Sequence, residues 1–342
     1  MVRGIVKPVL AIGGYMERTR SWLAVLLFVV FGSAVPFAVS AEDASGSGDN
    51  RHSEDAVCTK CHDESESKPI LAISQTPHGV TADARTPSCK SCHGDSKNHL
   101  AGNAAGGEGK RPPPDVLFGS KHSTAGYAAT DPKAQTEVCL TCHKSGLRQH
   151  WPGSQHESND VVCADCHKVH SATDPMLVKT DQPTVCFTCH KEQRAQIKQI
   201  SAHPLDVGKM ACSDCHNPHG SAGPKLLAKN TVTETCTTCH AEKRGPFLWE
   251  HQPVNEDCTN CHTPHGSNIS PLLKSRPPFL CDECHDGPHN SQAPYGTAVA
   301  GLQGAGAVPG GNPNSNAVGR ACMNCHVMVH GSNSPTGAFL HH

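Results

Sequence analysis

The motif Cys-x-x-Cys-His occurs ten times in the chain, and these ten pentads contain all 20 cysteines. Two cysteines three positions apart lie on one side of a helical turn, where both thiols can form thioethers with the vinyl groups of one haem, and the next histidine then faces the iron. This spacing is the attachment motif of c-type haem. The predicted attachment residues are Cys58, Cys61, Cys89, Cys92, Cys139, Cys142, Cys163, Cys166, Cys186, Cys189, Cys212, Cys215, Cys236, Cys239, Cys258, Cys261, Cys281, Cys284, Cys322 and Cys325.

Paired cysteines also occur in zinc ribbons and in disulfide frameworks. Either would account for the cysteines, but both leave the histidine that ends every pentad unexplained. The sequence therefore predicts ten haem c groups, each with one iron. The predicted proximal iron ligands are His62, His93, His143, His167, His190, His216, His240, His262, His285 and His326.

The sixth iron ligand must come from outside the pentads, where histidine and methionine compete. The chain has 25 histidines but only 6 methionines, and of these only Met176, Met210 and Met328 stand at plausible positions. Bis-histidine coordination is therefore favoured, and it sets lower potentials than coordination by histidine and methionine.

A two-haem module repeats from His156 onward: a histidine, a pentad, a histidine three residues later, and a second pentad. Its copies begin at His156, His203 and His251, and a looser copy begins at His78. A histidine three residues beyond a pentad reaches about 10 Å at most, too little to pass the porphyrin rim, so we expect it to bind a neighbouring haem. The predicted distal ligands are His78, His99, His156, His170, His203, His219, His251, His265, His289 and His330.

Five histidines remain and are expected at the surface, with His52 and His122 the first replacements for a failed assignment. They are His52, His122, His150, His341 and His342.

The elements that must position these residues are expected to be short. The chain has 8 Phe, 3 Trp and 3 Tyr against 31 Gly and 26 Pro, so the porphyrins must supply most of the buried apolar surface. We predict a multihaem cytochrome c fold of mostly irregular coil with short helices and little or no β structure, arranged as an elongated haem-wire array. Residues 191–200 are the best helix candidate, and single helical turns should surround the pentads.

Two segments, residues 94–119 and 290–319, are rich in Gly, Pro, Asn and Ala and are expected to be long loops. Each is either a solvated connection or a cover for haem edges at an end where partners dock.

The N-terminus has Arg18 and Arg20, then an apolar stretch, then small residues up to Ala41. This pattern predicts a secretory signal peptide at residues 1–41, with Met16 as an alternative start, and an uncleaved membrane anchor as the other reading. Residues 42–342 then form a decahaem electron-transfer domain built of repeated two-haem modules. Export agrees with haem attachment, which takes place outside the cytoplasm.

The formal net charge is −2, and haem propionates would make the loaded protein more acidic still. No basic run offsets this charge, so nucleic acid is not expected as a partner.

The chain resembles the periplasmic decahaem c-type cytochromes of the MtrA type, with their MtoA- and DmsE-like relatives, over nearly all of residues 56–340. The most specific segments are Cys-Ser-Asp-Cys-His-Asn-Pro-His-Gly at 212–220, His-Ala-Glu-Lys-Arg-Gly-Pro at 240–246 continuing to His251, and Val-His-Gly-Ser-Asn at 329–333. The resemblance supports the same ten distal histidines. It implies a protein associated with the outer membrane inside a β-barrel porin, with a periplasmic or inner-membrane cytochrome on one side and an outer-surface multihaem cytochrome or extracellular mineral on the other.

We expect an electron carrier and no enzyme, because no haem is predicted to have an open site. Extracellular metal reduction and Fe(II) oxidation are equally compatible with the sequence. A soluble periplasmic shuttle or store is the first alternative, and a multihaem reductase, which needs one open or unusually ligated iron, is the second.

Overall fold

The computed structural model describes residues 50–63, 65, 69–80, 83, 85–102, 111–119, 127–285, 322–335, 337 and 340. The predicted signal peptide, the predicted loop at 290–319, and His122, His289, His341 and His342 lie outside the described residues. The described residues all belong to one unit of the chain.

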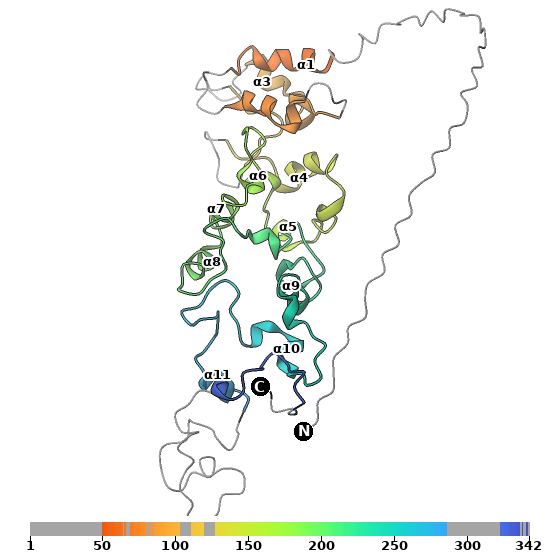
Figure 1. Ribbon diagram of the computed structural model, residues 1–342. Helices are drawn as coiled ribbons and strands as arrows, with labels where there is room; N and C mark the ends of the chain where they lie inside the picture. Colours follow the sequence, from red (N-terminus) through yellow and green to blue (C-terminus); the bar gives the residue numbers. More distant parts are fainter. Residues whose placement is uncertain are drawn as a thin grey trace, which may run out of the picture. The chain divides into compact units, whose positions relative to one another are not determined.

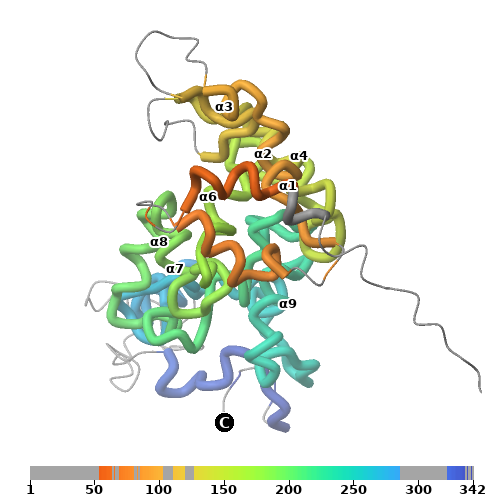
Figure 2. The backbone as a smooth tube through the Cα atoms, turned by 90° about the horizontal axis from the view of Figure 1, so that it is seen from above, coloured from red at the N-terminus to blue at the C-terminus, as the bar shows by residue number. Residues whose placement is uncertain are grey.

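Short helices and single 3-10 turns, labelled η, are the only regular elements in the described part of the chain, which has no β-strand. Figure 1 labels these short helices along the chain, and Figure 2 shows the irregular backbone that joins them. Four isolated β-bridges add local pairing. The α-helices are α1 (Asn50–Thr59), α2 (Cys89–His93), α3 (Lys97–Ala101), α4 (Pro132–Leu140), α5 (Gln155–Ser158), α6 (Cys163–Cys166), α7 (Gln182–Cys186), α8 (Lys191–Gln196), α9 (Val232–Thr237), α10 (Gln252–Glu256) and α11 (Phe279–Asp282), and the 3-10 turns are η1 (Ile70–Gln75), η2 (Pro77–Gly79), η3 (Gly146–Arg148), η4 (Pro175–Leu177), η5 (Cys212–Asp214), η6 (Pro224–Leu226), η7 (Ala241–Lys243), η8 (Cys258–Asn260) and η10 (Cys322–Asn324). This confirms the expected fold class of coil with short helices and little or no β structure.

Every pentad forms one helical turn, as its spacing predicts. In nine of them the histidine N–H donates to the carbonyl oxygen of the first cysteine, over 2.9 to 3.1 Å, and the remaining pentad is α2 itself. This bond between residues four apart is the α-helical one. It brings the two cysteine side chains to one side of the turn and places the histidine after them.

Side-chain caps fix where two of the helices that contain pentad cysteines begin. At α9 the Thr231 hydroxyl accepts from the Glu234 N–H, and the Glu234 carboxylate accepts from the Thr231 N–H, which is a capping box. At α4 the Asp131 carboxylate accepts from the N–H groups of Lys133 and Ala134, and Pro132 is the first helical residue. Cys139 and Cys236, the first cysteines of their pentads, therefore lie near the C-terminal ends of helices whose N-terminal ends are capped.

Two predicted segments differ from expectation. The helix predicted at 191–200 ends at Gln196, because Ile197 is buried and the chain then turns to pair Ser201 with Ser267. The predicted loop at 94–119 contains helix α3, and its last part is anchored where Val116 pairs with His93 by two hydrogen bonds. The carboxylate of Asp115, 19 residues away, accepts from the N–H of Ser96 at the start of α3, a contact that composition alone does not reveal.

Two modules share a return of the chain after their first pentad. His216 forms a β-bridge with Leu227, and His262 forms the corresponding bridge with Leu273. Each return brings a backbone carbonyl next to the pentad histidine, so the repeat in sequence is also a repeat in backbone structure.

Few apolar side chains are buried in the described residues. They are Trp151, Val162, Met176, Ile197, Ala211 and Leu273. A chain of this length ordinarily buries a much larger apolar core, so the polypeptide alone supplies little of the apolar burial that would stabilise it. Within the described ranges, no helix has both the length and the apolar character needed to cross a bilayer.

Candidate haem-binding site

Nine of the ten predicted proximal histidines face a second histidine in the structure. The ring centres of every pair lie 5.9 to 6.4 Å apart. The pairs, proximal residue first, are His62 and His99, His143 and His78, His93 and His170, His190 and His156, His167 and His219, His240 and His203, His216 and His265, His285 and His251, and His262 and His330.

This spacing fits one metal ion between the two rings. A metal–nitrogen bond of about 2 Å and about 1.1 Å from that nitrogen to the ring centre, taken on both sides, put two opposed imidazoles about 6.2 Å apart. Each proximal histidine also stands beside its two cysteines on a helical turn. The donor set and its spacing therefore fit haem c with an imidazole on each face.

All nine partners are predicted distal ligands. The tenth predicted distal ligand, His289, lies outside the described residues. His326, the tenth predicted proximal ligand, is not part of the nine pairs. His150, expected at the surface, is exposed, and His52 lies in α1. Iron ligation itself remains a prediction, but the pairing that the sequence left open is now defined.

The histidines that follow a pentad by three residues face pentad histidines of other modules. His219 faces His167 of the module before it, and His265 faces His216 in the same way. The sequence predicted that these histidines bind a neighbouring haem. In the structure each of them faces the histidine of the pentad two positions earlier in the series, and not that of the adjacent pentad. Each such pair brings residues of two successive modules together.

Hydrogen bonds to backbone carbonyl groups fix the tautomer of eight of these eighteen histidines. A backbone carbonyl can only accept, so the ring Nδ1 carries the proton and leaves Nε2 free to bind iron. The bonds run from His93 to Val116, His99 to Pro112, His156 to Pro218, His170 to Ile70, His203 to Pro264, His216 to Lys225, His251 to Val329 and His262 to Pro271.

Burial keeps several of the rings neutral, which is the form that binds a metal. Burial lowers the pKa of His93, and it lowers those of His216 and His265 in the same way. Burial, with His167 and Arg148 nearby, lowers the pKa of His219 to about 4. These side chains are therefore ready to bind iron at neutral pH.

Three of the Nδ1 bonds also join successive modules. His156 bonds the carbonyl just before His219, His203 the one before His265, and His251 the one before His330. The first histidine of each module thus holds the backbone just before a predicted distal histidine further along the chain.

Gly220, the residue after His219, allows its segment to approach the backbone of His150 closely. Gly220 has a φ of +111°, and a Cβ added there would collide with the carbonyl group of His150. A side chain at this position would push the two segments apart.

Cysteines of consecutive pentads lie near each other, from the first pentad to the last. The first cysteines are close enough to affect each other's pKa in five cases: Cys58 and Cys89, Cys139 and Cys163, Cys186 and Cys212, Cys236 and Cys258, and Cys281 and Cys322. At the four junctions between, the second cysteine of one pentad has its pKa raised by burial and by the second cysteine of the next: Cys92 by Cys142, Cys166 by Cys189, Cys215 by Cys239, and Cys261 by Cys284. No disulfide joins any of the 20 cysteines. The attachment sites thus form an unbroken series in sequence order, with two alternating kinds of junction.

Three buried donors near one pair have no acceptor in the protein: Arg148 Nε, Trp151 Nε1 and His219 Nδ1. The rings of Trp151 and His219 are in contact, with centres 6.4 Å apart. Buried donors of this kind normally have a partner, and a haem carries carboxylate groups that could accept from them. Their presence supports the fit of haem at this pair.

Comparison with known proteins agrees with this site. The model of the doubled CXXCH motif matches residues 156–195, 203–245 and 251–290, and each match begins at the leading histidine of a module. The multiheme cytochrome MtrA of Shewanella baltica is 42% identical over 287 residues, which are 83% of this chain and 80% of the relative. The chain belongs to the MtrA family.

Family membership identifies the chain as a multihaem electron-transfer cytochrome that binds haem c. The cytochrome c-type protein NrfB of Escherichia coli is a more distant relative, 28% identical over 180 residues, which are 49% of this chain and 82% of that protein. The resemblance to the MtrA family drawn from the sequence is thus confirmed.

Proposed function

We propose that residues 42–342 carry ten haem c groups, each bound by two histidines, and conduct electrons along the chain. The nine opposed histidine pairs support nine of these sites. His326 and His289 complete the tenth.

The unbroken series of neighbouring cysteines is the observation that carries this proposal. A conduit needs every haem to lie next to another, since electron transfer falls steeply with distance. At every junction between successive pentads, cysteines lie close enough for one to affect the pKa of the other, which supports this requirement. Electrons then enter near one terminal pentad, that of Cys58 or that of Cys322, and leave near the other.

The conduit acts in the periplasm, associated with the outer membrane inside a β-barrel porin. A backbone of coil and single turns cannot face hydrocarbon, because unpaired amide groups are costly there. A path across a layer about 30 Å thick therefore needs a protein sheath. The partners are the porin, a periplasmic or inner-membrane cytochrome, and an outer-surface multihaem cytochrome or extracellular mineral.

The role is that of a carrier and not of an enzyme. With an imidazole on each face, an iron has no position open to substrate. The nine opposed pairs support this assignment.

Reconstitution tests the proposal. The protein is produced together with an outer-membrane β-barrel porin of the MtrA-associated kind and placed in vesicles that enclose reduced methyl viologen, with ferric citrate outside. We expect the complex to oxidise the viologen much faster than the porin alone. The double variant C258A/C261A, which lacks one attachment site in the middle of the series, should be far slower. A protein that does not co-purify with a porin, or an interrupted variant that conducts as fast as the original, would contradict the conduit and favour a free periplasmic shuttle.

A further inference from the structure

The histidine of one pentad donates to a carboxylate. His167 Nδ1 lies 2.6 Å from Oδ2 of Asp174, and the two side chains are 30% and 16% exposed. The other Nδ1 hydrogen bonds described for the paired histidines all go to backbone carbonyl groups. A hydrogen bond to an ionised acceptor is about twice as strong as one to a neutral acceptor.

The corresponding histidines of the next two modules show what the chain ordinarily does here. His216 donates to the carbonyl of Lys225 over 3.0 Å, and His262 donates to that of Pro271 over 2.9 Å. Both acceptors stand nine residues after the histidine. In the first module that position is Met176, whose carbonyl instead accepts from Gln182 Nε2 over 3.1 Å.

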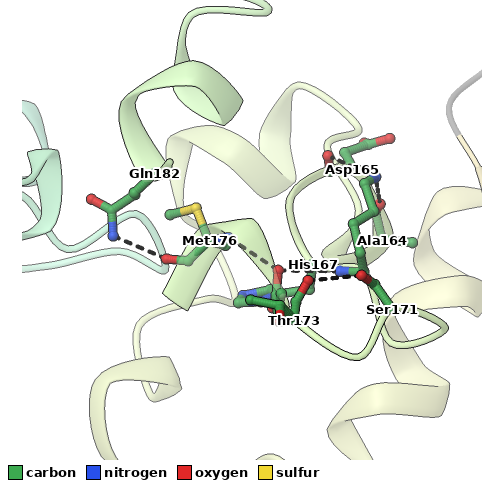
Figure 3. A network of polar contacts seen from close by, with 9 residues as sticks. Ala164, Asp165, His167, Ser171, Thr173, Met176 and Gln182 are labelled. Carbon is green, nitrogen blue, oxygen red and sulfur yellow. Dashed lines mark hydrogen bonds and ion pairs between the residues drawn. The ribbon is translucent and has the colours of Figure 1, made fainter. Parts of the chain in front are cut away.

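The local structure holds Asp174 in place for this different role. Its Oδ1 accepts from the Met176 N–H over 3.1 Å, which caps η4, and Oδ2 is left for His167. The neighbouring Lys168 amine donates to the Ala164 carbonyl over 2.8 Å, and Gln182 is held by Ser213 of the next module. Figure 3 shows His167 between Asp165 and Met176, with Gln182 bonded to Met176.

No carboxylate in the described part of the protein acts from the other face. The partner of His167 is His219, whose ring lies 6.1 Å away with planes 5° apart, and its buried Nδ1 has no acceptor in the protein. Among the protein's own groups, the carboxylate that distinguishes this pair from its counterparts is therefore that of Asp174.

We propose that Asp174 lowers the potential of the haem attached at Cys163 and Cys166 below those of its counterparts attached at Cys212 and at Cys258. A carboxylate acceptor gives the imidazole more anionic character, which makes it a stronger donor to iron and stabilises the ferric state, whose haem carries one more positive charge. Asp174 is thus a positioning residue that acts on iron through His167. In the proposed conduit, on which this inference rests, this haem is harder to reduce than the haems attached at Cys212 and at Cys258.

The test uses the full haem-loaded protein and the variant Asp174→Asn. Asparagine retains an oxygen for the Met176 N–H but removes the charge from His167. We expect the potentiometric titration to change by an amplitude equal to one haem in ten, shifted upward, while haem content and the low-spin spectrum stay unchanged. Asp174→Ser, whose hydroxyl can cap η4 but cannot reach His167, should give the same shift.

Glu242→Gln is the matched control. The Glu242 carboxylate lies 3.8 Å from His240 Nδ1, too far for a hydrogen bond, and is 62% exposed. Its removal should leave the titration unchanged. A downward shift, a shift shared by many haems, or no shift in either Asp174 variant would overturn the inference. If no shift occurs while ten low-spin haems and vesicle conduction persist, only the role of Asp174 fails; if ten low-spin haems are absent from the unmodified protein, the proposed function itself fails.

Discussion

Nδ1 of His203 donates a hydrogen bond of 2.7 Å to the carbonyl oxygen of Pro264, the residue that precedes His265. His203 faces His240 of its own module, and His265 faces His216 of the module before. His203 thus lies in a proposed haem site of its own module and also holds the backbone next to His265, a predicted distal ligand in the next module.

Replacement of His203 by methionine tests its assigned role. We expect one haem potential to rise by about 0.1–0.3 V, because a thioether stabilises ferrous iron relative to imidazole. Potentiometry of the haem-loaded protein measures this. His150→Met is the control, since His150 is exposed and faces no pentad histidine. An unchanged titration for the His203 variant would show that His203 is not a ligand.

Ring orientation predicts two kinds of low-spin iron. The planes of His167 and His219 are 5° apart, whereas those of His78 and His143 are 74° apart. Parallel and perpendicular imidazoles split the iron d orbitals differently. We expect the electron paramagnetic resonance spectrum of the oxidised protein to show a rhombic class and a class with one very large g value. A single class would contradict the pairing geometry.

The variant Gly220→Ala should destabilise the haem-loaded protein by about 2–3 kcal/mol, because the new Cβ meets backbone atoms of His150 in addition to the unfavourable positive φ. Gly153→Ala is the matched variant. Gly153 has a φ of +81° but has no atom close to an added Cβ, so we expect a loss of about 1 kcal/mol. Denaturant midpoints measure both. Equal losses would show that the close approach to His150 contributes nothing.

Loss of haem should unfold the chain. The described residues bury only a few apolar side chains, Trp151 and Val162 among them, too few to offset the conformational entropy of a chain of this length. We expect chain produced without haem-attachment machinery to exchange its amide hydrogens within seconds. Protection comparable to that of the loaded protein would contradict the view that haem forms the core.

The sequence was sufficient for the parts of this site that depend on local spacing. A pentad such as that of Cys212 makes its helical turn from its own five residues, so attachment and proximal ligation can be predicted without a structure. The choice of distal histidines also followed from the repeat. Their pairing did not, because His167 and His219 are brought together by returns of the chain between modules and not by local spacing.

The same distinction explains the features that sequence reasoning missed. Helix α3 depends on Asp115, which accepts from the Ser96 N–H, and loop composition gave no sign of this contact. The Asp174 acceptor was missed because the spacing of the motifs carries no information on which group accepts from His167 Nδ1. A comparison of the three modules position by position could have found it, since Asp174 aligns with Gly223 and Ile269.

Haem content and ligation together test the central claim most directly. The secreted protein is weighed by mass spectrometry, its haem is quantified as the pyridine complex, and its low-temperature magnetic circular dichroism is recorded. We predict ten covalent haems per chain, all low-spin with two imidazole ligands. Fewer than ten haems, or a high-spin iron with one open face, would contradict the account.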